Sequence, residues 1–128
     1  MKLVFPYVEK QGRWYPLIDI TLHGAKDSLR IKALPDSGAS FSIFRPEIAD
    51  FLDIPIESGK QMYLEGVGGW ILGYLHLLKV GVGSKRFPCK IVFSREFTVS
   101  LNLLGRDNFF EEFLITFDEQ KKQIVLGT

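Results

Sequence analysis

Residues 33–40 (ALPDSGAS) constrain the fold most, because they place one acid between an apolar segment and a run of small residues. Upstream, residues 29–34 alternate in a way that predicts a strand delivering Asp36 to its end. Gly38 lets two backbone segments approach closely, and Ser37 supplies a hydroxyl beside the carboxylate. Asp-Ser-Gly alone is also an ordinary turn, so the interpretation depends on the rest of the chain.

Two later stretches carry further signals. Residues 65–70 (EGVGGW) form a Gly-rich tip between two apolar arms, residues 62–64 and 70–78, which predicts a mobile hairpin. Residues 101–107 (LNLLGRD) form an apolar strand that runs into Gly-Arg-Asp and then into a short helical pattern over residues 108–113. Both stretches place small residues directly beside apolar strands.

The three motifs together resemble one family. Acid-Ser-Gly-Ala, then Gly-Val-Gly-Gly-aromatic, then Leu-Leu-Gly-Arg-Asp, in this order, is similar to the retropepsins, the retroviral-type aspartic proteases with their bacterial and cellular relatives. The resemblance runs from about residue 16 to the C-terminus. A helix expected from Pro46 looks more like the bacterial and cellular members than the compact viral ones.

Composition limits the architecture and the partners. The 128 residues are 46% hydrophobic and 24% charged, which predicts one packed domain, residues 1–128. With a net charge of +1 and basic residues scattered along the sequence, we expect neither a nucleic acid nor a membrane as partner. The single cysteine and two histidines argue against a disulfide, a metal or a cofactor, and they fit a cytoplasmic location. Pro6 and the charges after it also argue against a signal peptide.

Many short strands at close spacing predict a mainly β fold, a closed or semi-closed acid-protease barrel with one or two short helices. A helix is expected over residues 46–52, because Pro46 fits a first helical position. Strands are expected over residues 2–8, 14–22, 29–34, 61–64, 70–82, 85–93, 97–104, 114–117 and 123–126.

The resemblance implies an aspartic endopeptidase in which two carboxylates share one proton and activate a water. Since the chain has one Asp-Ser-Gly, the second carboxylate would come from another copy, so we expect a homodimer with Asp36 at its two-fold axis. Ser37 would hydrogen-bond across that axis, Gly38 would lie alongside the substrate backbone, and Ala39 would support the active site. We expect terminal strands, the C-terminal one above all, to join the dimer interface.

The other site residues follow from the same resemblance. Leu101 and Leu103 would line apolar pockets for a peptide or protein substrate, and the fork of Arg106 would reach an acid or carbonyls near the base of the site. The flap over the substrate would consist of Gly66, Val67, Gly68 and Gly69.

One departure from the family leaves a second function open. Ser40 and Phe41 stand where viral members commonly have acids, which removes a substrate anchor and the usual partner of the arginine. The alternative is a retropepsin-like domain for dimerisation or peptide binding with weak or no hydrolysis. Cys89 is expected to be a small core residue and not a nucleophile.

Overall fold

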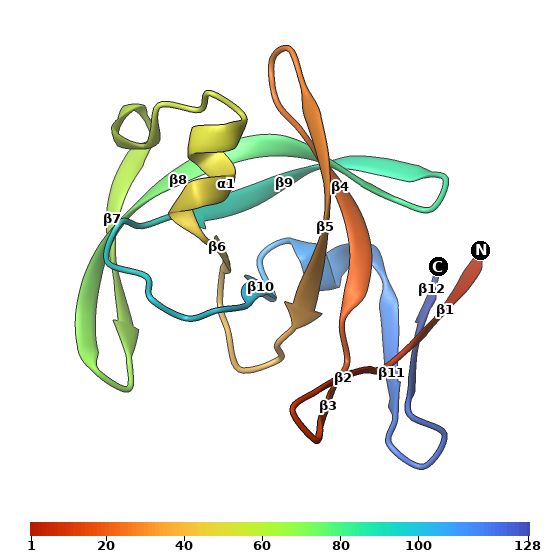
Figure 1. The fold of residues 1–128 in the computed structure, drawn as a ribbon. Coiled ribbons are helices and arrows are strands. Elements are labelled where there is room, and N and C mark those ends of the chain that lie inside the picture. The colour runs from red at the N-terminus through yellow and green to blue at the C-terminus, as the bar shows by residue number, and fades with distance from the viewer.

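The computed structural model describes all residues, 1–128, and shows a mainly β molecule with short helices, as predicted (Figure 1). The helical elements are α1 (Pro46–Phe51) and the single-turn 3-10 helices η1 (Ile56–Ser58) and η2 (Phe109–Glu112). The strands are β1 (Lys2–Pro6), β2 (Val8–Lys10), β3 (Arg13–Tyr15), β4 (Ile18–His23), β5 (Ser28–Pro35), β6 (Ser42–Phe44), β7 (Lys60–Gly66), β8 (Gly69–Val82), β9 (Lys85–Phe93), β10 (Asn102–Leu104), β11 (Leu114–Asp118) and β12 (Gln123–Gly127).

Seven strands form the main sheet in the order β4-β5-β10-β6-β9-β8-β7. The sheet curls, because β4 pairs with β8 as well as with β5. The short strand β10 lies between β5, with which it is parallel, and β6, with which it is antiparallel. This arrangement brings the ends of β5, β6 and β10 together, and it is there that two of the three sequence motifs lie.

The chain termini form a separate three-stranded sheet in the order β1-β12-β11. The strand predicted over residues 2–8 divides at Tyr7 into β1 and β2, although the Tyr7 N–H still donates to the Lys122 carbonyl at 2.8 Å. Pro6 ends β1, an edge strand, as expected for a residue that cannot donate a hydrogen bond. Strands β2 and β3 form a hairpin of their own that pairs with neither sheet.

Two predicted strands are shorter than expected. Residues 14–22 are divided between β3 and β4, because Pro16 and a turn from Tyr15 to Leu17 interrupt the ladder. Of residues 97–104 only the last three form a strand, because Phe97 closes a turn onto the Ser94 carbonyl at 3.2 Å. The apolar run that suggested a longer strand is explained by Phe97, which is buried without being part of a sheet.

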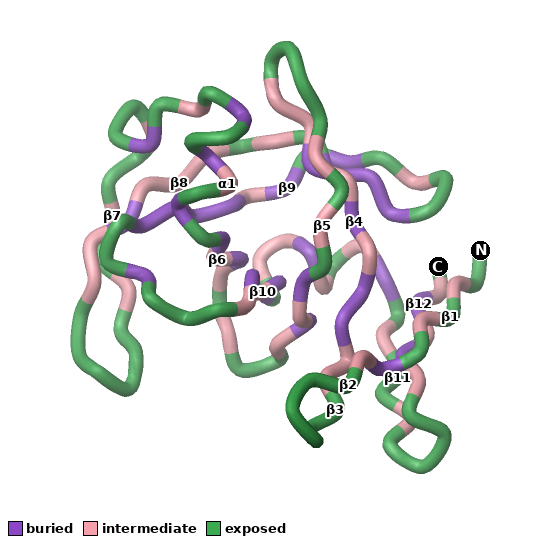
Figure 2. Tube along the Cα trace, in the orientation of Figure 1, coloured by how far each residue is buried: buried purple, intermediate pink, exposed green.

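The hydrophobic core lies inside the curled sheet and is closed by α1, η2 and the terminal sheet (Figure 2). Strand β4 alternates between buried and half-buried residues, so Ile18, Ile20 and Leu22 point inward. The largest fully buried side chains are Phe44, Phe93 and Phe109. None of the helices is long and apolar enough to cross a membrane.

Candidate active site

Asp36 follows the last residue of β5, where β5 lies beside β10. Its N–H donates to the Leu104 carbonyl at 2.9 Å, which fixes the start of the following loop. Its carboxylate Oδ1 accepts a hydrogen bond from the Gly38 N–H at 2.9 Å. The side chain is half-buried, forms no ion pair and accepts no other hydrogen bond within the chain. One carboxylate oxygen is thus oriented by the loop, and the other is free to interact with a second molecule.

The residues after Asp36 face outward. Ser37 and Gly38 are exposed and Ala39 is half-buried. The Ser37 hydroxyl makes no hydrogen bond within the chain, so its partner, if it has one, belongs to another molecule. The loop turns back through a hydrogen bond from the Ala39 N–H to the Asp36 carbonyl at 3.1 Å.

The Gly-Arg-Asp segment after β10 holds this loop in place. The N–H of Arg106 donates to the Ala39 carbonyl at 2.9 Å, and the N–H of Asp107 donates to the Ser40 carbonyl at 2.8 Å. Two motifs that are far apart in the sequence therefore form one backbone unit.

Gly105 makes this unit possible. A Cβ atom at this position would overlap the carbonyl group of Phe41 and lie 2.8 Å from its Cα, so only glycine allows the two backbones to cross. The Gly105 N–H donates to the Ser42 hydroxyl oxygen at 3.0 Å. The close approach and the hydrogen bond together place the loop from Asp36 relative to β10.

Two buried polar side chains support the site and were missed in the sequence. Ser42 is fully buried beneath Gly105, and Asn102 accepts a hydrogen bond from the Arg45 N–H at 2.9 Å and donates to the Lys32 carbonyl at 3.4 Å. The available signal was a single polar residue inside an otherwise apolar strand. Such a residue requires a hydrogen-bonding partner if the strand is buried.

The Arg106 side chain has no partner within the chain, so its predicted supporting role stays a prediction. It is exposed, and its guanidinium makes no hydrogen bond or ion pair within the chain. Since Ser40 and Phe41 replace the acids of the viral pattern, the loop offers this guanidinium no carboxylate. The ion pair at this edge joins Lys90 Nζ to Asp107 Oδ1 at 3.1 Å.

A row of apolar side chains crosses the sheet beside the aspartate. Leu34 lies opposite Leu103, and Leu103 lies opposite Ile43. The register continues to Val92, whose side chain is fully buried, and then to Leu75. Residues in register share a face of the sheet, and this face is the one turned away from the core. The predicted pocket residue Leu103 stands in the middle of the row, whereas Leu34 and Ile43 were not predicted.

Leu101 has a different place from Leu103. It is half-buried and lies just before β10, so no strand register places it in the apolar row. The pocket role that the resemblance implies for Leu101 therefore stays a prediction.

The Gly-rich tip is a hairpin, as predicted. Strands β7 and β8 pair up to Gly66 and Gly69, which leaves Val67 and Gly68 as a two-residue turn. Gly69 has a φ of 109°, a conformation that other residues rarely adopt. The Val67 side chain is fully exposed, and the tip projects from the body of the molecule (Figure 1).

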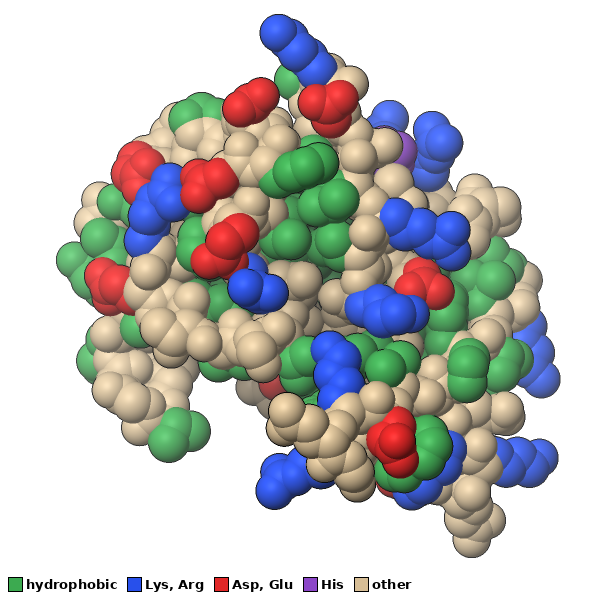
Figure 3. Space-filling model, in the orientation of Figure 1, with side chains coloured by type: hydrophobic (Ala, Val, Ile, Leu, Met, Phe, Trp, Pro, Cys, Tyr) green, Lys and Arg blue, Asp and Glu red, His purple; other side chains and the backbone are tan.

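One face of this hairpin continues the apolar row. Ile71 and Leu75 alternate along β8, and Met62 and Leu64 lie on the same face of β7. All four side chains are half-buried. In the space-filling view the molecule is hollowed between the hairpin tip and the rest of its lower edge (Figure 3). The hairpin face is thus joined to the apolar row by strand register, through Leu75 on β8.

Cys89 is a core residue, as expected. It is fully buried, and this burial raises the pKa of its thiol to about 12. The thiol therefore stays protonated at ordinary pH and is a poor nucleophile.

The His76 ring already has a hydrogen-bonding partner within the chain, because its Nε2 lies 2.9 Å from the Ile56 carbonyl oxygen.

Known proteins show the same architecture. No protein-family model matches the chain. The chain is 32% identical over 112 residues to DNA damage-inducible protein 1 of Neurospora crassa, a match that covers 85% of this chain but only 24% of that much longer protein. The crystal structure of a retropepsin-like aspartic protease from Rickettsia conorii superposes with a TM-score of 0.67 at 20% identity, covering 98% of this chain and 90% of that one.

These matches define the class of the molecule: it has the retropepsin-like fold, with an aspartate at the end of a strand and a glycine-rich hairpin beside it. The resemblance to the retropepsin-like family that the three motifs indicated is confirmed.

Proposed function

We propose that this chain is an aspartic endopeptidase that cleaves peptide bonds as a homodimer. The observation that supports it is the position of Asp36, an outward-facing carboxylate with one oriented oxygen and no ion pair, at the end of the apolar row. A second Asp36 on the opposite side of a two-fold axis would supply the other carboxylate that the chemistry needs.

The two carboxylates would share one proton. At a separation of about 3 Å two like charges cannot both persist, so one group is protonated while the other is ionised. The ionised carboxylate takes a proton from a water, which attacks the peptide carbon, and the protonated one donates to the carbonyl oxygen. The Gly38 N–H would keep the carboxylate in plane with its partner throughout, because it holds Oδ1 at 2.9 Å.

The substrate would be an extended peptide with apolar side chains near the cut. Leu34, Leu103 and Ile43 would contact those side chains on one side, and the apolar face of the β7–β8 hairpin would cover them on the other. The turn at Val67 and Gly68 would act as a flap that excludes water when it closes. Extended backbone in the substrate would pair with the strands that line the hollow.

The dimer would use the outer face of the terminal sheet. Val4, Val125 and Thr116 lie in register on this face, and Leu114 is 75% exposed beside them. The face encloses a shallow cavity of about 490 Å³, and β1 and β11 leave an open edge on each side. Such a surface suits a second copy, which would cover both the apolar side chains and the edges.

The Asp36→Asn variant tests this function. It keeps the shape and the Gly38 hydrogen bond but removes the base and the shared proton, so cleavage of a denatured protein should fall by at least ~10²–10⁴-fold. Asp53→Asn is the matched control, since Asp53 is exposed, forms no ion pair and has a φ of 55° that asparagine tolerates. Near-normal turnover of Asp36→Asn, or inhibition by chelators or thiol reagents, would contradict the assignment.

A second function is a dimeric peptide-binding domain with weak or no hydrolysis. It is favoured by Ser40 and Phe41 in place of the loop acids, which removes an expected substrate anchor, and by the Arg106 guanidinium, which has no partner within the chain. Incubation with a denatured protein between pH 4 and 7, with and without a statine-type transition-state mimic, separates the two. Binding of the mimic without cleavage would support the second function.

A further inference from the structure

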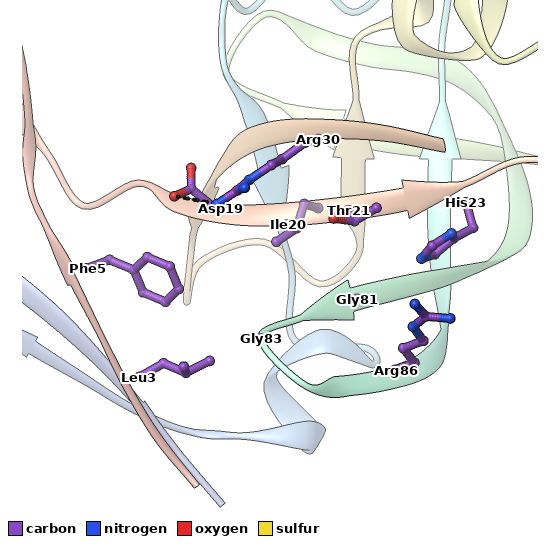
Figure 4. Close-up of a pocket in the computed structure, with 10 residues that line it drawn as sticks. All are labelled: Leu3, Phe5, Asp19, Ile20, Thr21, His23, Arg30, Gly81, Gly83 and Arg86. Carbon is purple, nitrogen blue, oxygen red and sulfur yellow. Dashed lines mark ion pairs between the residues drawn. The ribbon is translucent and has the colours of Figure 1, made fainter. Parts of the chain in front are cut away.

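A cavity of about 400 Å³ lies on the outer face of the main sheet, between β4, the β8–β9 hairpin and β1 (Figure 4). Arg30 on β5 lines this cavity. Asp36 follows six residues later, a distance of roughly 20 Å in extended chain. The cavity therefore lies outside the surface proposed for catalysis.

Gly81 forms the floor of this cavity. Thr21 lies opposite both Arg30 and Gly81, and Gly81 lies opposite Arg86, so the four residues form one row across β5, β4, β8 and β9. A Cβ atom on Gly81 would lie 3.6 Å from His23 Nε2, 3.7 Å from Thr21 Cβ and 3.9 Å from Arg86 Cγ. The missing side chain thus leaves a hollow that three polar side chains surround, with an arginine at each end of the row.

The rim of the cavity carries more positive than negative charge. Arg86 and Lys79 form no ion pair within the chain, and Arg30 comes no closer than 3.9 Å to Asp19. Asp19 is already engaged by Lys32 at 2.8 Å. Basic residues that are scattered in the sequence are therefore gathered by the fold over β4 and β5 (Figure 3). Asp19 is the one acid among the residues that line the cavity.

The opposite wall is apolar. Leu3 and Phe5 project from β1 into the cavity (Figure 4), and the Leu3 side chain packs on the β8–β9 turn, where a Cβ atom on Gly83 would lie 2.8 Å from its Cδ1. The cavity consequently offers two arginines, a histidine and a threonine on one side and an aliphatic and an aromatic side chain on the other.

We propose that this cavity binds an acidic peptide segment, with a carboxylate between Arg30 and Arg86 and an adjacent apolar side chain against Leu3 and Phe5. Guanidinium forks match carboxylates in geometry and can bind them through two hydrogen bonds. Three strand spacings, roughly 14 Å, separate the arginine backbones, a span that two long side chains can close around one carboxylate above Gly81.

The alternative anionic polymers fit less well. A nucleic-acid backbone is typically held through about six to ten phosphate contacts, more than these cations provide, and it would leave the apolar wall unused. The Asp19 carboxylate at one end opposes a continuous run of negative charge, whereas a peptide can place an uncharged residue there. The site is independent of the proposed cleavage chemistry, because it shares no residue with it.

The experiment is a titration of the ¹⁵N-labelled protein with the capped peptide acetyl-Glu-Phe-Glu-Leu-amide, followed by amide chemical shifts. A second titration uses the same peptide with glutamine for glutamate, and mass spectrometry checks that the peptide stays intact. Shifts should centre on Thr21, Gly81 and Arg86, and the glutamine peptide should bind at least tenfold more weakly. Higher salt should weaken binding, since part of the attraction is screened.

Three variants locate the binding. The double variant Arg30→Gln/Arg86→Gln should weaken it at least tenfold, whereas Lys10→Gln/Arg13→Gln, which removes two cations from the separate β2–β3 hairpin, should change it less than twofold. Gly81→Leu fills the hollow without removing charge and should also abolish binding.

Several results would overturn the proposal. Shifts centred on the Asp36 loop would place the peptide in the catalytic hollow, and equal binding of the glutamine peptide would exclude carboxylate recognition. Binding that survives Gly81→Leu would show a diffuse charged surface and not a built cavity. Tighter binding of a uridine oligonucleotide or of anionic vesicles at the same residues would assign this face to another partner.

Discussion

Gly105→Ala should disrupt the candidate site by displacing backbone. The added Cβ would overlap the Phe41 carbonyl group, and no flexible side chain can move to relieve this contact. The two segments must separate, which breaks or stretches the hydrogen bond from Gly105 to Ser42 and the two from the following N–H groups to the loop carbonyls. At about 1 kcal/mol for each net hydrogen bond, the free energy of unfolding should fall by about 3 kcal/mol.

Equilibrium unfolding in urea measures this loss, and Gly81→Ala is the matched control. Gly81 is also a buried strand glycine, but its added Cβ would meet neighbours at ordinary contact distances of 3.6 Å or more. The control should therefore change stability by less than about 1 kcal/mol. If Gly105→Ala proved as stable as the control, or if its cleavage activity matched the unmodified protein, the crossing of the two backbones would not position the Asp36 loop.

The remaining predictions concern the dimer and the response to pH. Leu114→Glu should weaken self-association in sedimentation, whereas Leu77→Glu, at an equally exposed apolar position outside the terminal sheet, should not; equal effects would refute the proposed interface. Burial, and then the hydrogen bond to Glu119, raise the pKa of Tyr7 from 10.0 to about 12. The contribution of Tyr7 to the free energy of unfolding is therefore fully present below pH 10 and is lost as the pH rises toward 12. Tyr7→Phe should flatten that alkaline loss in urea unfolding, and an unchanged slope would exclude this tyrosine as its source.

A point substitution is a better test of the interface than removal of the C-terminal strand. Strand β12 is the central strand of the terminal sheet, and its Ile124 and Leu126 are fully buried in the core. Deleting it would unfold this sheet and would not separate dimerisation from folding. Leu114 can change without this effect, because its side chain points away from the core.

The predictions that the structure confirms rest on signals within a few neighbouring residues. The alternation before Asp36, the glycines around Val67 and the proline that starts α1 each act within a few residues, through side-chain periodicity or allowed backbone angles. These features place the aspartate at a strand end and the hairpin tip at a two-residue turn, as found. The order of the motifs then supplied the fold, which local signals alone would not have fixed.

The failures concern contacts between distant segments. Arg106 was expected to reach an acid or backbone carbonyls, and within this chain it has neither, because such a partner depends on which residues the loop carries and not on the arginine itself. The cluster of basic residues around the cavity could not be predicted from the sequence for the same reason. Arg30, Lys79 and Arg86 become neighbours only through the pairing of β4 with β8. Strand register of this kind is a long-range property that periodicity does not specify.

The way the Asp36 loop is held suits a protease that works in acid. Apart from the Gly38 N–H, which donates to the Asp36 carboxylate, the backbone N–H groups that fix the loop donate to the carbonyls of Leu104, Ala39 and Ser40 or to the Ser42 hydroxyl, and none of these acceptors titrates. By contrast, the exposed ion pairs of the molecule weaken once their carboxylates take up protons.

Even the most persistent of those ion pairs lies away from the loop. Hydrogen bonds from Arg95 hold the pKa of Asp50 below its usual range, so this pair persists to lower pH than an ordinary carboxylate would allow. It links α1 to the turn after β9. Falling pH would therefore loosen exposed ion pairs such as Arg95–Asp50 while the backbone hydrogen bonds of the Asp36 loop persist, as the proposed acid-active site would need.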